Sequence, residues 1–323
     1  MGETQRSVTP NVDLPHEIQR LIFEMAARSQ RGRAGFNLIQ VAHYVYTWIE
    51  PILYECIEIL SASVASSLLR TISTRDHAFL DSTVRALVVS GDLNLKSAKP
   101  IFAACSQGIV SFSAWGNTEN PSKYLPFIDS PRLRRLALIS NRPRRKTYDD
   151  PFDIPTGMLI MLTHIVLVSN FSYIAWDDLE RALKLNLRAS SAPAASLTAT
   201  PTTLASFDAF QNLTHFAIAR VAWRQISIIR QVAKKLRYFV ILSRPNTLTH
   251  PSIIQGVWSL NDRRLVVVNM EDFSDWPQGD SRWRGPSYST LHRCVTTFWE
   301  TVETLVANGF ISDQGDKWGY EKA

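Results

Sequence analysis

Apolar residues near the N-terminus recur three or four positions apart, which is the spacing of an amphipathic α-helix. The stripe consists of Leu14, Ile18, Leu21, Ile22 and Met25. Pro15 stands where a helix begins, because its fixed φ suits the first turn and its missing N–H is not needed there. Glu17 falls in the same turn, where the helix dipole favours negative charge. The segment therefore predicts a helix whose apolar face needs a cover, either its own core or another protein.

A second helical pattern follows a basic, glycine-containing turn at residues 31–35. Its apolar positions are Leu38, Val41, Ala42, Val45, Trp48 and Ile49. We expect Pro51 to end this helix, because proline lacks the helical N–H and clashes with the preceding turn. The pair Leu53-Tyr54 and an extended-looking run at residues 56–59 come next.

Together these segments resemble the F-box, a short helical module that docks on a Skp-type adaptor of cullin–RING (SCF) ubiquitin ligases. The resemblance is carried by Leu14-Pro15-His16-Glu17-Ile18, Ile22-Phe23, the helix that ends near Trp48, and Leu53-Tyr54. It covers about residues 12–59 and is most similar to the F-box-like proteins abundant in mushroom-forming fungi. The chain departs from the family at residues 42–48, which replace the usual Cys-Arg-x-Trp run.

The resemblance implies a set of adaptor-facing residues and a role as substrate-recognition subunit of the ligase. The adaptor-facing set is Leu14, Pro15, Ile18, Ile22, Phe23, Val41 and Trp48. Residues 12–53 would form the module, behind a disordered N-terminus at residues 1–11. The alternative is a non-catalytic scaffold for protein–protein interaction, in which the N-terminal helices only cap a solenoid. Docking needs the apolar stripe exposed in the free protein, whereas capping needs it covered.

From residue 54 onward another pattern returns: an apolar residue, two variable residues, an apolar residue, one variable residue, and a third apolar residue. The matches begin at Tyr54, Val84, Ile109, Leu133, Leu162, Leu213, Leu236 and Leu265. Most successive starts lie 23–30 residues apart, and one step is 51, whereas leucine-rich repeats have periods of roughly 20–29 residues. Each triplet is typical of a short buried strand, and helical stretches such as residues 61–74 lie between triplets. Strand, turn and helix in repetition predict a parallel sheet.

This second pattern resembles the leucine-rich-repeat-like class of F-box proteins, without the Asn or Cys that closes each turn in the strict motif. The predicted fold class is α/β, with the all-α module followed by a leucine-rich-repeat-like solenoid over residues 54–271. Residues 189–206, rich in Ser, Ala, Thr and Pro, are expected to form a flexible insertion. Residues 272–323 would form a C-terminal cap and tail, with a helix over 290–308 covering the last repeat. The rival is a doubly wound α/β domain, which needs a glycine-rich phosphate turn that this sequence lacks.

Substrate binding is assigned to variable positions that the repeat phase places on the inner strand face. These positions are Arg135, His164, His215 and Tyr238. The dipeptides Thr163-His164 and Thr214-His215 recur at the same repeat position, so two histidines on one face could suit a metal or a proton transfer. The other interpretation makes them polar residues of a repeated pattern, because no Cys or carboxylate partner stands at ligand spacing.

Composition narrows the class of protein. The chain has 323 residues, of which 45% are apolar and 20% charged, which indicates a globular protein with a sizeable core. The cysteines Cys56, Cys105 and Cys294 fit neither a disulfide framework nor metal-site spacing. The sequence shows no apolar run of membrane-spanning length and no signal-peptide pattern, so we expect a cytoplasmic or nuclear protein.

The remaining chemistry points away from an enzyme. The net charge of +6 is mild, and the basic cluster at residues 142–146 favours a solvated loop or a nuclear-import signal over a nucleic-acid interface. No catalytic or cofactor motif is found. We therefore expect a protein that is not an enzyme and has no cofactor or metal. The expected partners are a Skp-type adaptor with its cullin complex and an unknown protein substrate, with no nucleic acid and no membrane.

Overall fold

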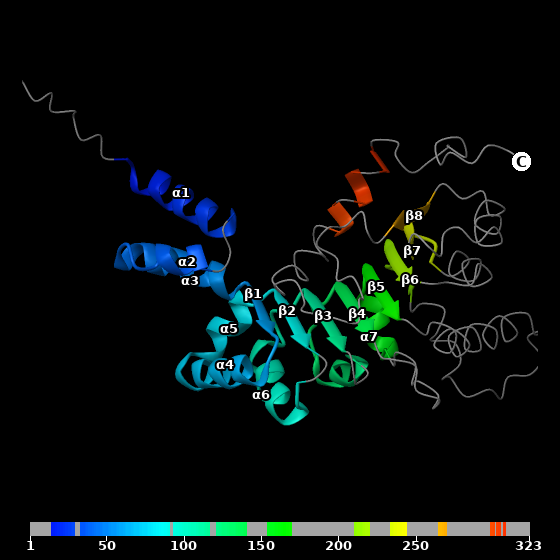
Figure 1. Ribbon diagram of the computed structural model, residues 1–323, viewed down its shortest axis with the longest axis horizontal. Coiled ribbons are helices and arrows are strands. Elements are labelled where there is room, and N and C mark those ends of the chain that lie inside the picture. Colours follow the sequence, from blue (N-terminus) through cyan, green and yellow to red (C-terminus); the bar gives the residue numbers. More distant parts are fainter. Residues whose placement is uncertain are drawn as a thin grey trace, which may run out of the picture. The chain divides into compact units, whose positions relative to one another are not determined.

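The computed structural model divides the chain into two compact units, Met1–Cys56 and Ile57–Ala323 (Figure 1). The described residues are 14–29, 33–90, 93–116, 121–140, 154–169, 210–219, 233–243, 264–269, 298–300, 302–304 and 306–307. The expected disordered N-terminus at 1–11 and the expected insertion at 189–206 lie outside the described residues. Of the expected cap and tail, only the residues between 298 and 307 named above are described.

The first unit consists of three helices. They are α1 (His16–Ser29), α2 (Arg33–Leu38) and α3 (His43–Tyr54). Helix α1 packs against both α2 and α3. The buried core is small and consists of Ala27, Val45, Ile49 and Ile52. The apolar residues at its edge are Phe23, Leu38, Ile39, Ala42, Trp48 and Leu53.

Helix α3 does not end at Pro51, so that prediction is wrong. The helix continues to Tyr54 with Pro51 inside its last turn. Proline removes one backbone hydrogen bond there, but Ile49 and Ile52 are buried in the core on either side of it. The packing of Ile52 therefore holds the last turn in helical form.

The second unit is built on one sheet. Its strands are β1 (Cys56–Ile59), β2 (Ala86–Ser90), β3 (Ser111–Gly116), β4 (Arg135–Ser140), β5 (His164–Ser169), β6 (His215–Ala219), β7 (Tyr238–Ser243) and β8 (Leu265–Asn269). Its helices are α4 (Ala62–Thr74), α5 (His77–Thr83), α6 (Leu95–Cys105), the 3₁₀-helix η1 (Pro121–Phe127) and α7 (Thr156–Met161). The strands follow one another in chain order, and the pairs from β2 to β8 are all parallel. The α/β class is thus confirmed, and the described strands show no reversal of order such as a doubly wound sheet has.

Local sequence signals explain where the helices of this unit begin. The helix expected at 61–74 is α4, and the Ser61 hydroxyl accepts a hydrogen bond from the backbone N–H of Val64 at 3.3 Å. Asp76 caps α5 and Asn94 caps α6 in the same manner. Such side-chain caps satisfy backbone N–H groups that have no partner within the helix.

The apolar triplets form the core on one side of the sheet. The first residues of six triplets are each at most 3% exposed: Val84, Ile109, Leu133, Leu162, Leu213 and Leu236. The ring of Phe102 on α6 meets Phe112 of β3 edge-on at 6.1 Å and Tyr124 of η1 at 5.7 Å between ring centroids. The Tyr124 hydroxyl is buried and lies 2.7 Å from the carbonyl oxygen of Leu93. The helices therefore cover the face that the second and third triplet positions point to.

The last triplet has a different phase from the one the pattern predicts. The pattern makes Leu265 the first apolar position, followed by Val268 and Met270. In the sheet Leu265 pairs with Phe239, which is the second position of its own triplet. Residues 265–268 are apolar on both faces of the strand, so alternation alone does not reveal which face is inward.

Candidate protein-binding site

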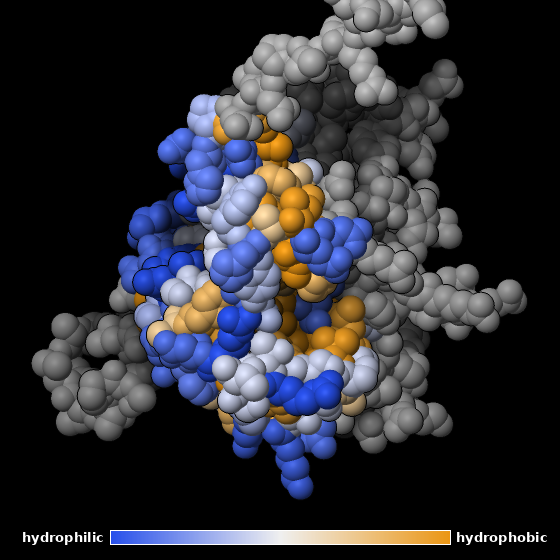
Figure 2. All heavy atoms as spheres, turned by 90° about the vertical axis from the view of Figure 1, so that its left-hand side faces the viewer, coloured by the Kyte–Doolittle hydropathy of each residue, from blue (hydrophilic) through white to orange (hydrophobic). Residues whose placement is uncertain are grey.

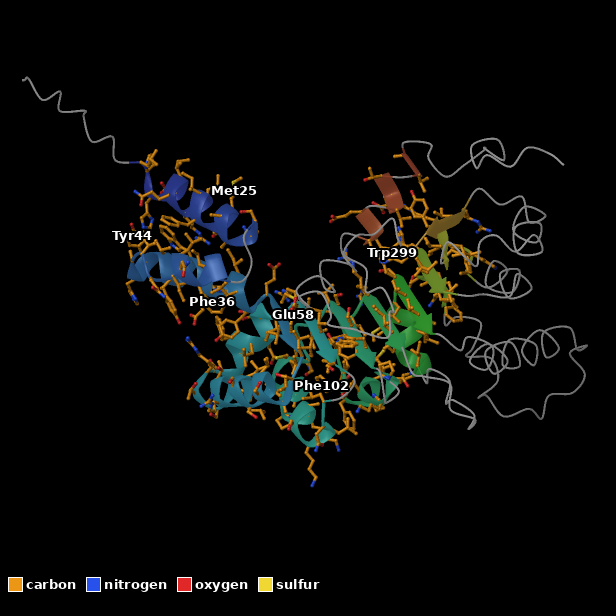
Figure 3. All side chains as sticks on the ribbon, in the orientation of Figure 1. Met25, Phe36, Tyr44, Glu58, Phe102 and Trp299 are labelled. Atoms are coloured by element: carbon orange, nitrogen blue, oxygen red, sulfur yellow. The ribbon has the colours of Figure 1, made fainter. Side chains whose placement is uncertain are left out.

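An apolar stripe on α1 is exposed in the first unit. The exposed fractions are 47% for Leu14, 43% for Ile18, 53% for Leu21, 50% for Ile22 and 61% for Met25. Figure 2 shows apolar surface between hydrophilic side chains on the side where the N-terminal helices lie. Figure 3 shows Met25 pointing away from α1. Contiguous exposed apolar side chains of this kind mark interaction sites in folded proteins.

Helix α1 has a second apolar face, which serves its own core. At about 100° per residue, the stripe falls within an arc of roughly 100°. Phe23 and Ala27 point to the other side, where Ala27 is fully buried. Because the core uses this separate face, the stripe is not needed to hold the three helices together.

The adaptor-facing set of the sequence analysis divides into two groups. Leu14, Pro15, Ile18 and Ile22 are exposed together at the start of α1, and Val41 is 59% exposed in the turn before α3. Phe23 and Trp48, in contrast, pack at the edge of the core. These two side chains position α1 on α3, and they are the members of the set least open to a partner.

A cluster of rings fixes the start of α1 on α3. Trp48 meets His16 edge-on at 4.6 Å and Tyr44 at 4.9 Å between ring centroids. The Tyr44 hydroxyl lies 3.5 Å from Oε1 of Gln19 on α1. This contact orients the first turn of α1 and, with it, Ile18.

Two further exposed aromatic side chains were not in the predicted set. Phe36 on α2 is 57% exposed and Tyr44 on α3 is 43% exposed. Phe36 lies in α2, a six-residue helix that begins inside the segment expected as a turn at residues 31–35, and no apolar periodicity could single it out. Both enlarge the apolar surface that this unit offers.

The flank of α1 is charged. Glu24 accepts from Arg20 Nε at 2.7 Å and from Arg28 Nη1 at 3.3 Å. The hydrogen bond from Arg20, followed by that from Arg28, holds the pKa of Glu24 below its usual value against the opposing effect of burial. The two i,i+4 pairs support the helix and keep the flank hydrophilic.

In the second unit, the four predicted substrate residues lie in one row. The pairing register aligns Arg135 with His164, His164 with His215, and His215 with Tyr238. We call these four residues the polar row. The row runs across β4 to β7 on the face opposite the helices, as the repeat phase predicts. Arg135, His164 and Tyr238 are partly exposed, but His215 is 4% exposed.

The two histidines of the polar row are stacked and tied to the backbone. Their ring centroids are 4.1 Å apart, with an angle of 8° between the planes. Each Nδ1 lies within hydrogen-bond distance of the preceding threonine hydroxyl, at 2.8 Å for Thr163 and 2.7 Å for Thr214. Those hydroxyls also donate to the backbone carbonyls of the residues that directly precede the neighbouring strands, Arg134 before β4 and Thr163 before β5. The repeated dipeptide therefore forms a ladder between strands.

Residues of the C-terminal segment cover His215, which removes it from any free surface. Nε2 of His215 lies 3.2 Å from Oε1 of Glu303, and the ring of Trp299 meets His215 at 5.0 Å and His164 at 5.6 Å. Figure 3 labels Trp299 on this segment. His215 stays a predicted substrate contact, but it is not accessible while this segment is in place.

The chemistry of the polar row is that of a packed structural element. Burial, followed by the charges of His215 and Arg135, lowers the pKa of His164 to about 3. Burial also lowers the pKa of His215, against the effect of Glu303, which raises it. Stacked rings do not converge on a common point, and among the described residues no group of three or more His, Cys, Asp or Glu could hold a metal ion.

Stability should depend on His164 in acid. Because the folded state keeps His164 neutral while the unfolded chain protonates near pH 6.5, its contribution is complete above pH 6.5 and is lost as the pH falls toward 3. We expect the free energy of unfolding to fall by up to about 1.4 kcal/mol per pH unit for this group. The free energy of unfolding, measured by urea denaturation at several pH values between 7 and 4, should change less with pH in His164→Asn than in wild type. The same dependence of the free energy of unfolding on pH in His164→Asn and in wild type would contradict the assignment.

None of the described helices is long and apolar enough to cross a membrane. Comparisons with protein-family models, curated proteins and solved structures found no match to this chain.

Proposed function

We propose that this protein is an F-box-type substrate-recognition subunit of a cullin–RING (SCF) ubiquitin ligase. The observation that carries the proposal is the exposed stripe of α1, which the unit's own core leaves uncovered. It coincides with the Leu-Pro-x-Glu-Ile segment on which the resemblance to the F-box rests. An amphipathic helix with one free apolar face is suited to binding in a hydrophobic groove of a partner.

The adaptor would contact the exposed members of the set. Leu14, Ile18 and Ile22 provide the apolar contact, and Val41 adds to it from the turn before α3. Phe23 and Trp48 act indirectly, because they set the angle of α1 on α3. Burying half-exposed aliphatic side chains of this size gains roughly 1 kcal/mol each, since full burial is worth about 1.5–3 kcal/mol.

For the second unit, we propose a leucine-rich-repeat-like solenoid that binds a protein substrate. The support is the run of parallel strands in chain order and the recurrence of one buried residue before each of six strands. In this function nothing reacts on the chain itself. The protein holds the substrate beside a ubiquitin-loaded enzyme and raises its effective concentration there.

Co-expression with a Skp-type adaptor tests the proposal. We expect the full chain and the adaptor to elute together from a size-exclusion column as a one-to-one complex, with the mass measured by light scattering. A well-folded chain that elutes alone would contradict the proposal. That outcome would favour the scaffold in which the stripe caps the protein's own repeats.

A further inference from the structure

A second row of side chains lies beside the polar row on the same face of the sheet. The pairing register aligns Ser113, Ala137, Val166, Ala217, Val240 and Val266 across β3 to β8. We call these six residues the central row. Each is at most 2% exposed. Since all six side chains are short, a helix can approach the strands closely along this row.

The central row is covered by the chain's own C-terminal helix, by which we mean the helical residues described between 298 and 307. Phe298, Trp299 and Val302 are buried in the same cluster as the five apolar residues of the central row, and Val306 packs against it. These positions form one apolar face of a helix. Glu303 extends the contact to the polar row through His215. Figure 1 shows these helical residues, in orange-red, on the side of the sheet away from α4 and α6.

The fit leaves polar groups unpaired. The hydroxyls of Ser111 and Ser113 and the indole N–H of Trp299 are buried, and no hydrogen-bond partner is present for them among the described residues. Trp299 lies in this interface, and Ser111 and Ser113 lie on the same face of β3 as the central row. Buried polar groups without partners cost free energy, so a ligand that pairs with the two serine hydroxyls would bind this strand face more favourably than the described residues of the helix do.

We propose that the C-terminal helix is a displaceable intramolecular ligand of the strand face on which substrate binds. The partner that fits is a protein segment forming an amphipathic helix with the same chemistry. It carries two adjacent aromatic residues, apolar residues one and two turns further on, and a carboxylate that reaches the histidines of the polar row. The inference rests on the proposed function only in naming this partner a substrate.

The covalent tether explains why such a partner would bind weakly to the resting protein. The C-terminal helix is joined to β8 through residues 270–297. A tethered ligand is present at a high effective concentration and competes with any segment supplied in trans. A short helix gains its stability mainly from packing, whereas β4 to β8 are held together by their own strand pairing, to which the described helical residues contribute no strand.

Fluorescence anisotropy on the full chain tests the proposal with a labelled peptide of residues 295–308 as the probe. The variant Trp299→Asp/Val302→Asp should release the helix and bind the peptide at least about 10-fold more tightly than wild type. The control Thr304→Asp/Ala307→Asp adds the same two charges at exposed positions and should bind as weakly as wild type. A peptide carrying the two aspartates at 299 and 302 should not bind. Equal peptide affinity of the folded release variant and wild type would overturn the proposal.

If the release variant does not fold, hydrogen exchange of the wild-type protein tests whether the C-terminal helix can be displaced. A displaceable helix opens locally, so amides at 298–307 should exchange faster than those of β4 to β7. Exchange of both regions only through global unfolding would show that the helix is a fixed part of the core and would overturn the proposal. Neither measurement involves the adaptor, so failure here is distinct from failure of adaptor binding.

Discussion

The variant Ile18→Asp/Ile22→Asp should lose adaptor binding while the protein remains folded. Both side chains lie on the exposed stripe, so two aspartates there remain hydrated in the free protein. In a complex the two carboxylates would be buried against an apolar groove without partners, which is strongly unfavourable. We expect the Kd for a Skp-type adaptor to rise at least about 100-fold, or about 3 kcal/mol, measured by isothermal titration calorimetry.

A charge-matched control shows whether the loss of binding comes from the position of the two aspartates or only from their charge. Asn37→Asp/Gln40→Asp places two carboxylates on exposed polar positions of the same unit and should bind the adaptor like wild type. Circular dichroism should give the same thermal unfolding for all three proteins. If the Ile18/Ile22 variant loses cooperative unfolding, the stripe packs within the protein itself, as the capping alternative requires.

Replacing Gly108 with alanine should strongly destabilise the second unit. A Cβ at this position would lie 2.1 Å from the carbonyl oxygen of Asp81 and 2.5 Å from that of Val84. Both atoms belong to the backbone at the end of α5, so no side-chain rotation relieves the clash. The connection between α6 and β3 must then move away from α5, at a cost of roughly 3 kcal/mol.

Gly157 provides the matched comparison. A Cβ there meets nothing within 4 Å, and the residue lies in the first turn of α7. Gly157→Ala should therefore be neutral or stabilise by up to about 1 kcal/mol, because alanine loses less backbone entropy on folding. In urea denaturation, the midpoint of Gly108→Ala should shift to a lower urea concentration than that of wild type. The midpoint of Gly157→Ala should be unchanged or higher. Similar losses in both would contradict the close approach at Gly108.

Much of the second unit follows from the sequence, because an equivalent apolar residue is buried before each of the six strands from β2 to β7. Leu133 and Leu213 could be recognised as equivalent from their spacing, and both are fully buried. The row formed by Arg135, His164, His215 and Tyr238 follows from the same phase. The repeat phase predicted from the sequence is wrong at Leu265, because residues 265–268 are all apolar and do not alternate between polar and apolar positions.

The cover over His215 could not be predicted from the pattern. The sequence indicates a helix near residue 298 and its apolar face, but it does not indicate which surface that face meets. We expected the helix to cover the end of the last repeat, whereas Trp299 packs on β5 and β6 instead. The deciding signal is three-dimensional: the five apolar side chains of the central row, far apart in sequence, form one strip.

Within the first unit, helical periodicity correctly placed Ile18 and Ile22 on one stripe and left Phe23 out of it, whereas the family motif added Phe23 to the adaptor-facing set. Phe23 is one position from Ile22 and matches the family motif, yet its side chain turns toward Ala27 and the core. The length of α3 is also decided by packing. The free energy gained by burying Ile52 outweighs the backbone hydrogen bond lost at Pro51, so the helix continues to Tyr54.

Met25 offers the most direct test of the central claim, because it is the most exposed apolar residue of the stripe. Its oxidation by dilute peroxide, followed by mass spectrometry, reports whether the stripe is covered. The account predicts rapid oxidation in the free full chain and strong protection when a Skp-type adaptor is bound. A complex in which Met25 oxidises as fast as in the free chain would contradict docking through α1.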